Sequence, residues 1–208
     1  MRSHCPPCGK REQGVTLLEV LVTIIIVTIG LLGLAGLQVR IQAAEIESYQ
    51  RVQALVLLQD MVDRLSANRK QAVSYVTSGV GTGGSIDDCT AYTAAADIYR
   101  RDLCEWNNAL LGASENIGTC TSADKSGCVG AMAGGRGCIS NPVTTMPYEF
   151  IVSVAWQGLT PTAVPTASTC GQDQYGTNDA HRRVVTQRVV FTCLQSMADG
   201  VTCATATP

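Results

Sequence analysis

Aromatic residues and positive charge are both scarce in this chain of 208 residues. Aromatic residues make up 5 % of the sequence, which argues against an extended surface for stacking nucleic-acid bases. The formal net charge is −2, whereas proteins that bind nucleic acid generally carry an excess of Lys and Arg. Charged residues amount to only 15 %, the reverse of what a disordered chain requires. These proportions predict a folded protein that is not a general nucleic-acid binder.

Histidine is rare as well, and no motif typical of catalysis accompanies it. Of the two histidines, His181 is the only one after the first apolar segment, and Arg182 follows it directly. No Ser or Cys stands in a recognisable nucleophile motif. Asp97, Asp102 and Glu105 resemble paired carboxylates, but they alternate with arginines, which is typical of the solvated face of a helix. We predict no enzyme activity, no metal and no cofactor.

Proline is absent between Pro7 and Pro142, and this interval begins with a long apolar segment. From Val15 to Leu37 the only charged residue is Glu19. About 20 apolar residues, each adding ~1.5 Å of helix, span a bilayer core, so the segment is long enough to cross a membrane. The cations that precede it predict a cytoplasmic N-terminus.

Three kinds of N-terminal segment compete to explain this pattern. A cleaved secretory signal has a shorter apolar core, and a small-residue cleavage site follows it. A plain signal anchor fits the length but leaves Glu19 unexplained, because a carboxylate at membrane depth is costly and usually functional. The third is a segment with a short leader that is cleaved before the apolar stretch, and the residues around Gly14 point to it.

The sequence on both sides of Gly14 matches a known processing signal. Lys10-Arg11-Glu12-Gln13-Gly14 followed by Val15-Thr16-Leu17-Leu18-Glu19 resembles the processing site of type IV prepilins. The resemblance implies cleavage after Gly14 by a membrane-embedded prepilin peptidase and methylation of the new N-terminus at Val15. It also makes Glu19 the fifth mature residue. Such pilins usually begin with Phe, so Val15 departs from the pattern.

The resemblance implies a role for Glu19. In the family, this carboxylate is thought to meet the N-terminal amine of a neighbouring subunit in the filament core. Opposite charges attract strongly in a low-dielectric interior, but desolvating them is also costly. We therefore expect the pair to set the register of the subunits more than the stability of the filament. The alternative is a carboxylate tolerated at the membrane interface.

The apolar segment continues into a helix-forming sequence without a break. Residues Gln38–Gln71 are rich in Ala, Leu, Gln, Glu and Arg, and apolar residues recur every three or four positions between Leu55 and Leu65. We predict one helix from about Val15 to Ala72, ~85 Å long at ~1.5 Å per residue. Residues 15–37 would form its membrane and filament part, and residues 38–76 its amphipathic continuation.

Three glycines interrupt the apolar part of this helix, at Gly30, Gly33 and Gly36. Each weakens a helix by ~1 kcal/mol relative to Ala. They either let neighbouring helices approach closely or let the segment unwind when it leaves lipid for a filament. Ordinary transmembrane glycines without a specific role are the third alternative.

A narrower resemblance concerns the stretch Ile29-Gly30-Leu31-Leu32-Gly33-Leu34-Ala35-Gly36-Leu37-Gln38, which is similar to type IV pilus modification (PilV-type) minor pilins. Asp97 to Leu111 and Val154-Ala155-Trp156-Gln157-Gly158 also look like that group. The resemblance covers about Lys10 to Arg69 and is loose beyond. Pseudopilins of type II secretion share the N-terminal signature, so they remain an alternative.

Residues 77–208 are predicted to form a periplasmic head of the α+β class. The expected elements are a flexible connector at Thr77–Asp88, a helix at Ala94–Leu111, strands at Gly137–Ser140, Tyr148–Trp156 and Val184–Leu194, and a long loop at Gln157–Ala180. In the strand Tyr148–Trp156, Glu149 and Ser153 face away from the apolar side. The family resemblance implies a small antiparallel sheet packed on the long helix.

The ten cysteines fall on the two sides of the apolar segment, two before it and eight after it. Cys5 and Cys8 lie in the leader, residues 1–14, and have no expected role in the mature protein. The eight disulfide candidates are Cys89, Cys104, Cys120, Cys128, Cys138, Cys170, Cys193 and Cys203. In an oxidising periplasm they predict up to four disulfides, and eight cysteines allow 105 pairings. We favour Cys193 with Cys203 and argue against Cys89 with Cys104, because a straight helix between them would place them ~22 Å apart.

Together these features predict a disulfide-stapled minor pilin without catalytic activity. Its predicted partners are prepilin peptidase, the major pilin, other minor pilins and the inner membrane, from which it moves to an extracellular pilus. The alternative is a tip adhesin or DNA-uptake subunit that uses a basic cluster of Arg182, Arg183 and Arg188. Against DNA binding, the chain from Ala72 onward holds 7 Lys and Arg but 11 Asp and Glu, a net charge of −4.

Overall fold

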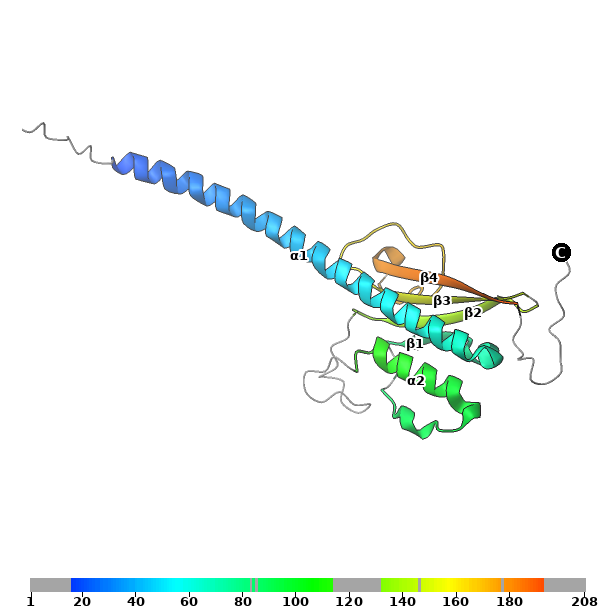
Figure 1. Cartoon of the computed structure of the whole chain (residues 1–208). Helices are drawn as coiled ribbons and strands as arrows, with labels where there is room; N and C mark the ends of the chain where they lie inside the picture. The colour runs from blue at the N-terminus through cyan, green and yellow to red at the C-terminus, as the bar shows by residue number, and fades with distance from the viewer. Residues whose placement is uncertain are drawn as a thin grey trace, which may run out of the picture. The chain divides into compact units, whose positions relative to one another are not determined.

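The computed structural model describes residues 16–82, 84, 86–113, 132–145, 147–176 and 178–192. The chain divides into two compact units, and the boundary falls between Ala44 and Glu45. The first helix, α1 (Leu17–Ala67), runs through this boundary (Figure 1). The described part of the first unit is therefore Thr16 and the N-terminal part of α1, and the second unit contains the rest of α1 together with all other described elements.

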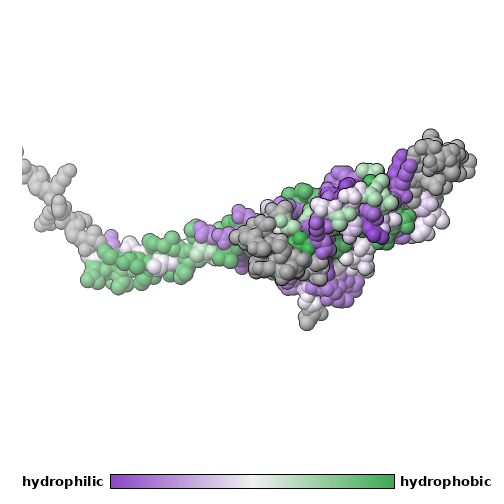
Figure 2. Space-filling model, turned by 90° about the horizontal axis from the view of Figure 1, so that it is seen from below, coloured by the Kyte–Doolittle hydropathy of each residue, from purple (hydrophilic) through white to green (hydrophobic). Residues whose placement is uncertain are grey.

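The N-terminal part of α1 exposes almost all of its apolar side chains. Leu17 is 84 % exposed, and the exposed set continues through Leu37. Figure 2 shows hydrophobic residues along this part of the helix. Among the described residues, α1 is the one helix long and apolar enough to cross a membrane, judged by length and composition alone.

The described part of the second unit contains one sheet and one further α-helix. The four antiparallel strands are β1 (Thr77–Gly81), β2 (Arg136–Val143), β3 (Tyr148–Gln157) and β4 (Arg182–Phe191), in the spatial order β1-β2-β3-β4. The helix α2 (Ile98–Leu110) and the short 3₁₀ helices η1 (Arg69–Tyr75), η2 (Cys89–Ala91), η3 (Ala95–Asp97) and η4 (Asp179–His181) complete it. The α+β class, with a small antiparallel sheet on a long helix, is confirmed.

One face of the sheet packs against α1 and α2. From α1 come Leu58, Met61 and Leu65, and from β3 come Phe150 and Val152, all buried. Fully burying a side chain of this size contributes about 1.5–3 kcal/mol. The alternating pattern of β3 and the three-and-four pattern of α1 therefore supply the two apolar surfaces that meet.

Trp106 of α2 lies at the centre of this contact and is fully buried. Its indole Nε1 donates a hydrogen bond of 2.9 Å to the backbone oxygen of Leu57 in α1. On its other side the ring covers Gly137 of β2, where an added Cβ would lie 2.2 Å from Trp106 Cη2. One side chain thus joins both helices and the sheet, and it requires glycine beneath it.

The opposite face of the sheet is covered by the chain between β3 and β4. Ser153 and Ala155 of β3 are buried there with Cys170 and Tyr175. The alternation of this strand predicts that one side is buried and the other open, and the second part of this prediction is wrong. Ser153 does face away from Phe150, as expected, but it is 2 % exposed. The reason is that Ser168 Oγ donates to Ser153 Oγ at 3.0 Å, so the loop lies directly on this face.

Two further boundaries differ from the sequence expectations. The connector expected at Thr77–Asp88 begins as strand β1, whose Val80 pairs with Gly137 of β2. The long helix ends at Ala67 rather than near Ala72, and the chain continues as η1. An edge strand made of Gly, Ser and Thr shows no alternation of apolar and polar residues. Pattern analysis misses it because its stability comes mostly from pairing with the neighbouring strand.

Two disulfides link the described cysteines, Cys89–Cys104 and Cys138–Cys170. The argument against Cys89–Cys104 is wrong, because no straight helix joins these residues. The chain passes through η2 and η3 before α2 begins at Ile98, and the two Cα atoms lie 5.7 Å apart. Cys120, Cys128, Cys193 and Cys203, and with them the favoured pair, lie outside the described residues.

The tight contact between Trp106 and Gly137 predicts that Gly137→Ala destabilises the second unit by about 2 kcal/mol, the usual range for overpacking being 1–3 kcal/mol. The measurement is thermal unfolding of the full chain in detergent, followed by near-ultraviolet circular dichroism. Gly79→Ala in β1 is the matched control, because a Cβ there meets no atom within 4 Å. Equal melting temperatures for the two variants would contradict the role of Trp106.

Candidate assembly site

The first turn of α1 is fixed by Thr16, which directly precedes the helix. The backbone N–H of Glu19 donates to Thr16 Oγ1 at 3.3 Å and to the Thr16 carbonyl oxygen at 3.0 Å. Thr followed three residues later by Glu is the capping-box pattern, which satisfies backbone donors that a helix start otherwise leaves free. The residues that resemble a processing signal therefore also contain a helix-start signal.

The carboxylate of Glu19 lies on the exposed surface of this turn. Within the described residues it makes no hydrogen bond or ion pair, so it is available to a group from another molecule. A negative charge in the first turn is favoured by the helix dipole. Its neighbours Leu17 and Leu18 are exposed apolar side chains, so any partner would meet the carboxylate in apolar surroundings. Gly14 and Val15 lie outside the described residues.

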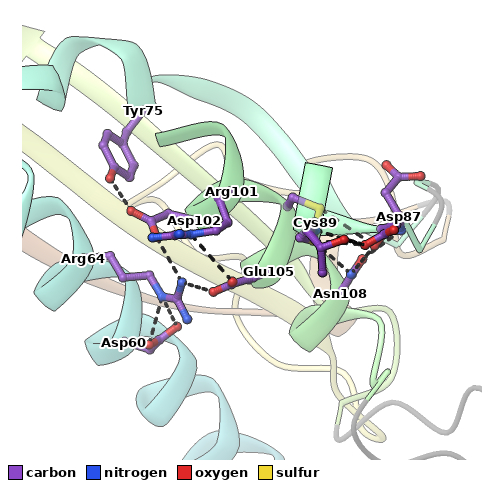
Figure 3. Close-up of polar contacts among 12 residues, drawn as sticks. Asp60, Arg64, Tyr75, Asp87, Cys89, Arg101, Asp102, Glu105 and Asn108 are labelled. Carbon is purple, nitrogen blue, oxygen red and sulfur yellow. Dashed lines mark hydrogen bonds and ion pairs between the residues drawn. A yellow bond between two sulfur atoms is a disulfide. The ribbon is translucent and has the colours of Figure 1, made fainter. Parts of the chain in front are cut away.

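A polar cluster in the second unit, made of Asp60, Arg64, Tyr75, Asp102 and Glu105, joins α1, η1 and α2 (Figure 3). Arg64 Nε donates to both carboxylate oxygens of Asp60, at 3.0 and 3.1 Å. Arg64 Nη1 donates to Asp102 at 3.2 Å and also to Glu105. The hydroxyl of Tyr75 donates to the other oxygen of Asp102. The guanidinium thus binds carboxylates from two helices at once.

The polar cluster shifts the acidity of two of its members. Burial and then the hydrogen bond to Asp102 raise the pKa of Tyr75, so the phenol stays protonated and donates. Burial alone would lower the pKa of Arg64, but the hydrogen bonds to Glu105 and Asp60 outweigh it and the pKa is raised. Both groups therefore keep one protonation state over the physiological pH range.

The expectation that Asp97, Asp102 and Glu105 form a solvated face is wrong for Asp102. That residue is 7 % exposed, because it faces Tyr75 and Arg64. Asp97 and Glu105 do pair with arginines along α2, at 3.6 and 3.9 Å. Sequence analysis did not predict the burial of Asp102 because its partners Tyr75 and Arg64 are 27 and 38 residues away in the sequence.

The basic cluster expected from Arg182, Arg183 and Arg188 does not form. Arg182 is 2 % exposed, and its Nε donates to Asp179 at 3.0 Å. Arg183 Nε donates to Glu47 of α1 at 2.6 Å. Only Arg188 is largely exposed, at 66 %, and it contacts a glutamate. These three arginines therefore do not form a joint positive surface, because each of them pairs with a carboxylate.

Arg182 holds the chain between β3 and β4 in place. Its Nη1 donates to the carbonyl oxygens of Ser168 and Cys170, at 2.6 and 3.1 Å, and its Nη2 donates to that of Pro165 at 2.9 Å. Asp179 in turn accepts from the backbone N–H of Asp173 at 2.8 Å. The only sequence signal for this arrangement is an acid three residues before the arginine.

We predict that Arg182→Lys lowers the free energy of unfolding of the second unit by about 3 kcal/mol. Lys retains the charge but lacks the planar fork of donors, so the carbonyl oxygens of Ser168, Cys170 and Pro165 would lose their partner. Each buried group left unpaired costs about 1–3 kcal/mol. Denaturant unfolding of the full chain in detergent measures the change. Arg188→Lys, at an exposed pair of the same strand, should alter stability by less than about 0.5 kcal/mol. A stable Arg182→Lys chain would show that its carbonyl contacts contribute little.

Two family models match the sequence. A model described as type IV pilin Tt1218 matches residues 36–143, which is just over half of the chain, and a model of the prokaryotic N-terminal methylation motif matches residues 9–35. Searches of curated proteins and of solved structures returned no match. The second match spans Gly14, Val15 and Glu19. Neither match names the PilV-type minor pilins, so that narrower assignment stays a prediction. The chain therefore belongs to the type IV pilin family, whose members are structural subunits and not enzymes.

Proposed function

We propose that the chain is a minor pilin, made as a prepilin in the inner membrane, cleaved after Gly14 and methylated on Val15. The methylation-motif match over residues 9–35 is the observation that supports the processing steps of this proposal. The helix start supports it, because Thr16 caps α1 only two residues beyond the proposed cleavage site. Prepilin peptidase is the partner that this processing requires.

In this proposal residues 1–14 are the leader and residues 15–37 are first a membrane span and then part of a filament core. Apolar side chains as exposed as those of Leu17–Leu37 need either lipid or the helices of other subunits around them. In the segment 38–76 the helix continues to Ala67 and η1 follows it, and residues 77–208 form the periplasmic head. The disulfides Cys89–Cys104 and Cys138–Cys170 suit an oxidising compartment.

Glu19 then meets the N-terminal amine of a neighbouring subunit. Its carboxylate has no partner within the described residues and lies among exposed apolar side chains. An amine brought to this position would be attracted strongly, because the surroundings have a low dielectric constant. Since both charges also lose their hydration, the pair would select one register between subunits rather than add much net stability.

The role in assembly initiation or in a tip complex rests on the resemblance of residues 29–38 to PilV-type minor pilins. A type II secretion pseudopilin is the alternative with the same N-terminal signature. DNA uptake through the three arginines is disfavoured, because Arg182 and Arg183 are engaged by Asp179 and Glu47. Other pilins, major and minor, are its proposed partners in the filament.

Glu19→Ala tests the assembly role. We expect the variant to be processed and retained in the membrane, but reduced at least about tenfold in sheared pili and in co-purification with other pilins. Immunoblots of membrane and pilus fractions measure both. Glu45→Ala is the matched control, since Glu45 is also an exposed acid of α1. Normal incorporation of Glu19→Ala would remove the proposed role of the carboxylate.

Mass spectrometry of the mature N-terminus tests the processing step. We expect the first peptide from the envelope fraction to begin at Val15 and to carry one methyl group on its amine. Cells lacking the prepilin peptidase should retain the chain from Met1. A chain that begins at Met1 in peptidase-positive cells would contradict the prepilin proposal.

A further inference from the structure

The second unit contains a polar hollow between the β1–β2 edge of the sheet and the chain that covers it. Its volume is about 330 Å³, and the polar side chains that line it are Ser78, Arg136, Thr169, Gln172 and Gln174. Pockets for small molecules begin at about 300 Å³, so the hollow suits a ligand of about one sugar ring. It is remote in sequence from the residues that the proposed assembly role uses.

Arg136 gives this hollow a positive charge. It is the only charged residue among the described residues that line it. Its Nε is buried and has no hydrogen-bond partner. Arg182, Arg183 and Arg188 all contact carboxylates, whereas Arg136 forms no ion pair with any described residue. The hydroxyl of Tyr175 is a neutral hydrogen-bond partner of the Arg136 side chain. The guanidinium therefore has no counter-charge within the described residues, and an anion bound in the hollow would supply one.

The walls of the hollow are held in place before any ligand arrives. The disulfide Cys138–Cys170 fastens the covering chain to β2 beside Arg136. The guanidinium of Arg182 holds the carbonyl oxygen of Cys170 at 3.1 Å, and the hydroxyl of Tyr175 donates to Gly134 at 2.8 Å. At Gly171, whose φ is +65°, an added Cβ would lie 2.8 Å from the Tyr175 ring. Binding groups fixed in this way lose little entropy when they engage a ligand.

The side chains around Arg136 match a ligand that carries hydroxyl groups as well as a negative charge. The fork of an arginine binds a carboxylate through two parallel hydrogen bonds. The hydroxyls of Ser78 and Thr169 and the amides of Gln172 and Gln174 can each donate and accept, as sugar hydroxyls require. We propose that this hollow binds a uronic acid residue of an acidic polysaccharide, with the carboxylate on Arg136 and the ring hydroxyls on the surrounding polar side chains.

Calorimetric titration of the full chain with methyl glucuronoside tests this proposal, in a polyoxyethylene detergent that has no sugar head group. Methyl glucoside is the matched ligand, because it replaces only the carboxylate. We expect saturable binding of the glucuronoside that is at least about tenfold tighter than that of the glucoside. Arg136→Gln should abolish this preference, whereas Arg188→Gln on β4 should leave it unchanged. Both effects follow from the loss of a charge-assisted hydrogen bond.

Gln174→Ala serves as a second variant that retains the guanidinium, and it should weaken glucuronoside binding a few-fold through the loss of one hydrogen bond. Thermal melting identifies any variant that does not fold. Equal binding of glucuronoside and glucoside would overturn the proposal, as would unchanged binding by folded Arg136→Gln. Inorganic sulfate that binds as tightly as the glucuronoside would also overturn it, because it would reveal a site for anions in general. None of these outcomes depends on incorporation into pili, so this proposal and the assembly role can fail separately.

Discussion

The second unit is organised around the side chain of Trp106. Its ring fills the space between α1, α2 and the sheet, and its indole nitrogen reaches the backbone of α1 at Leu57. Glycine at position 137 lets the ring approach β2 directly. A single rigid group that contacts three elements fixes their spacing, because none can shift without opening a void or forcing an overlap. The other contacts of the unit, including the polar cluster, are built on this spacing.

Two arginines extend this organisation beyond the apolar core. Arg64 binds carboxylates of α1 and α2, and Arg182, at the start of β4, binds the chain between β3 and β4. Each stands where several segments of the chain meet. A buried ion pair adds little net stability, because desolvation offsets attraction, but it penalises any arrangement that leaves one charge alone. These pairs therefore select one geometry, which the two described disulfides reinforce.

Elements with a strong local period could be predicted from sequence, and contacts between distant segments could not. The long helix and β3 follow from repeats of three to four and of two residues. The helix start was predicted at about Val15, within two residues of its observed position at Leu17. Strand β1 escaped prediction because small residues carry no such period. Asp102, Ser153 and the Cys89–Cys104 disulfide were misjudged for one shared reason. Their surroundings are set by segments 15 to 38 residues away in the chain, which local sequence does not reveal.

The strand order β1-β2-β3-β4 has a consequence for how the protein is made. Every strand pairs only with strands that come directly before or after it, so no strand must wait for a distant one to be inserted between its neighbours. A chain delivered from its N-terminal end can thus extend the sheet one edge at a time, with α1 already present as the template. Adding strands in this order shortens the period during which an unpaired edge is open to aggregation. The slowest pairing should be that of β1 with β2, because Gly81 and its partner Arg136 are separated by 55 positions in the sequence.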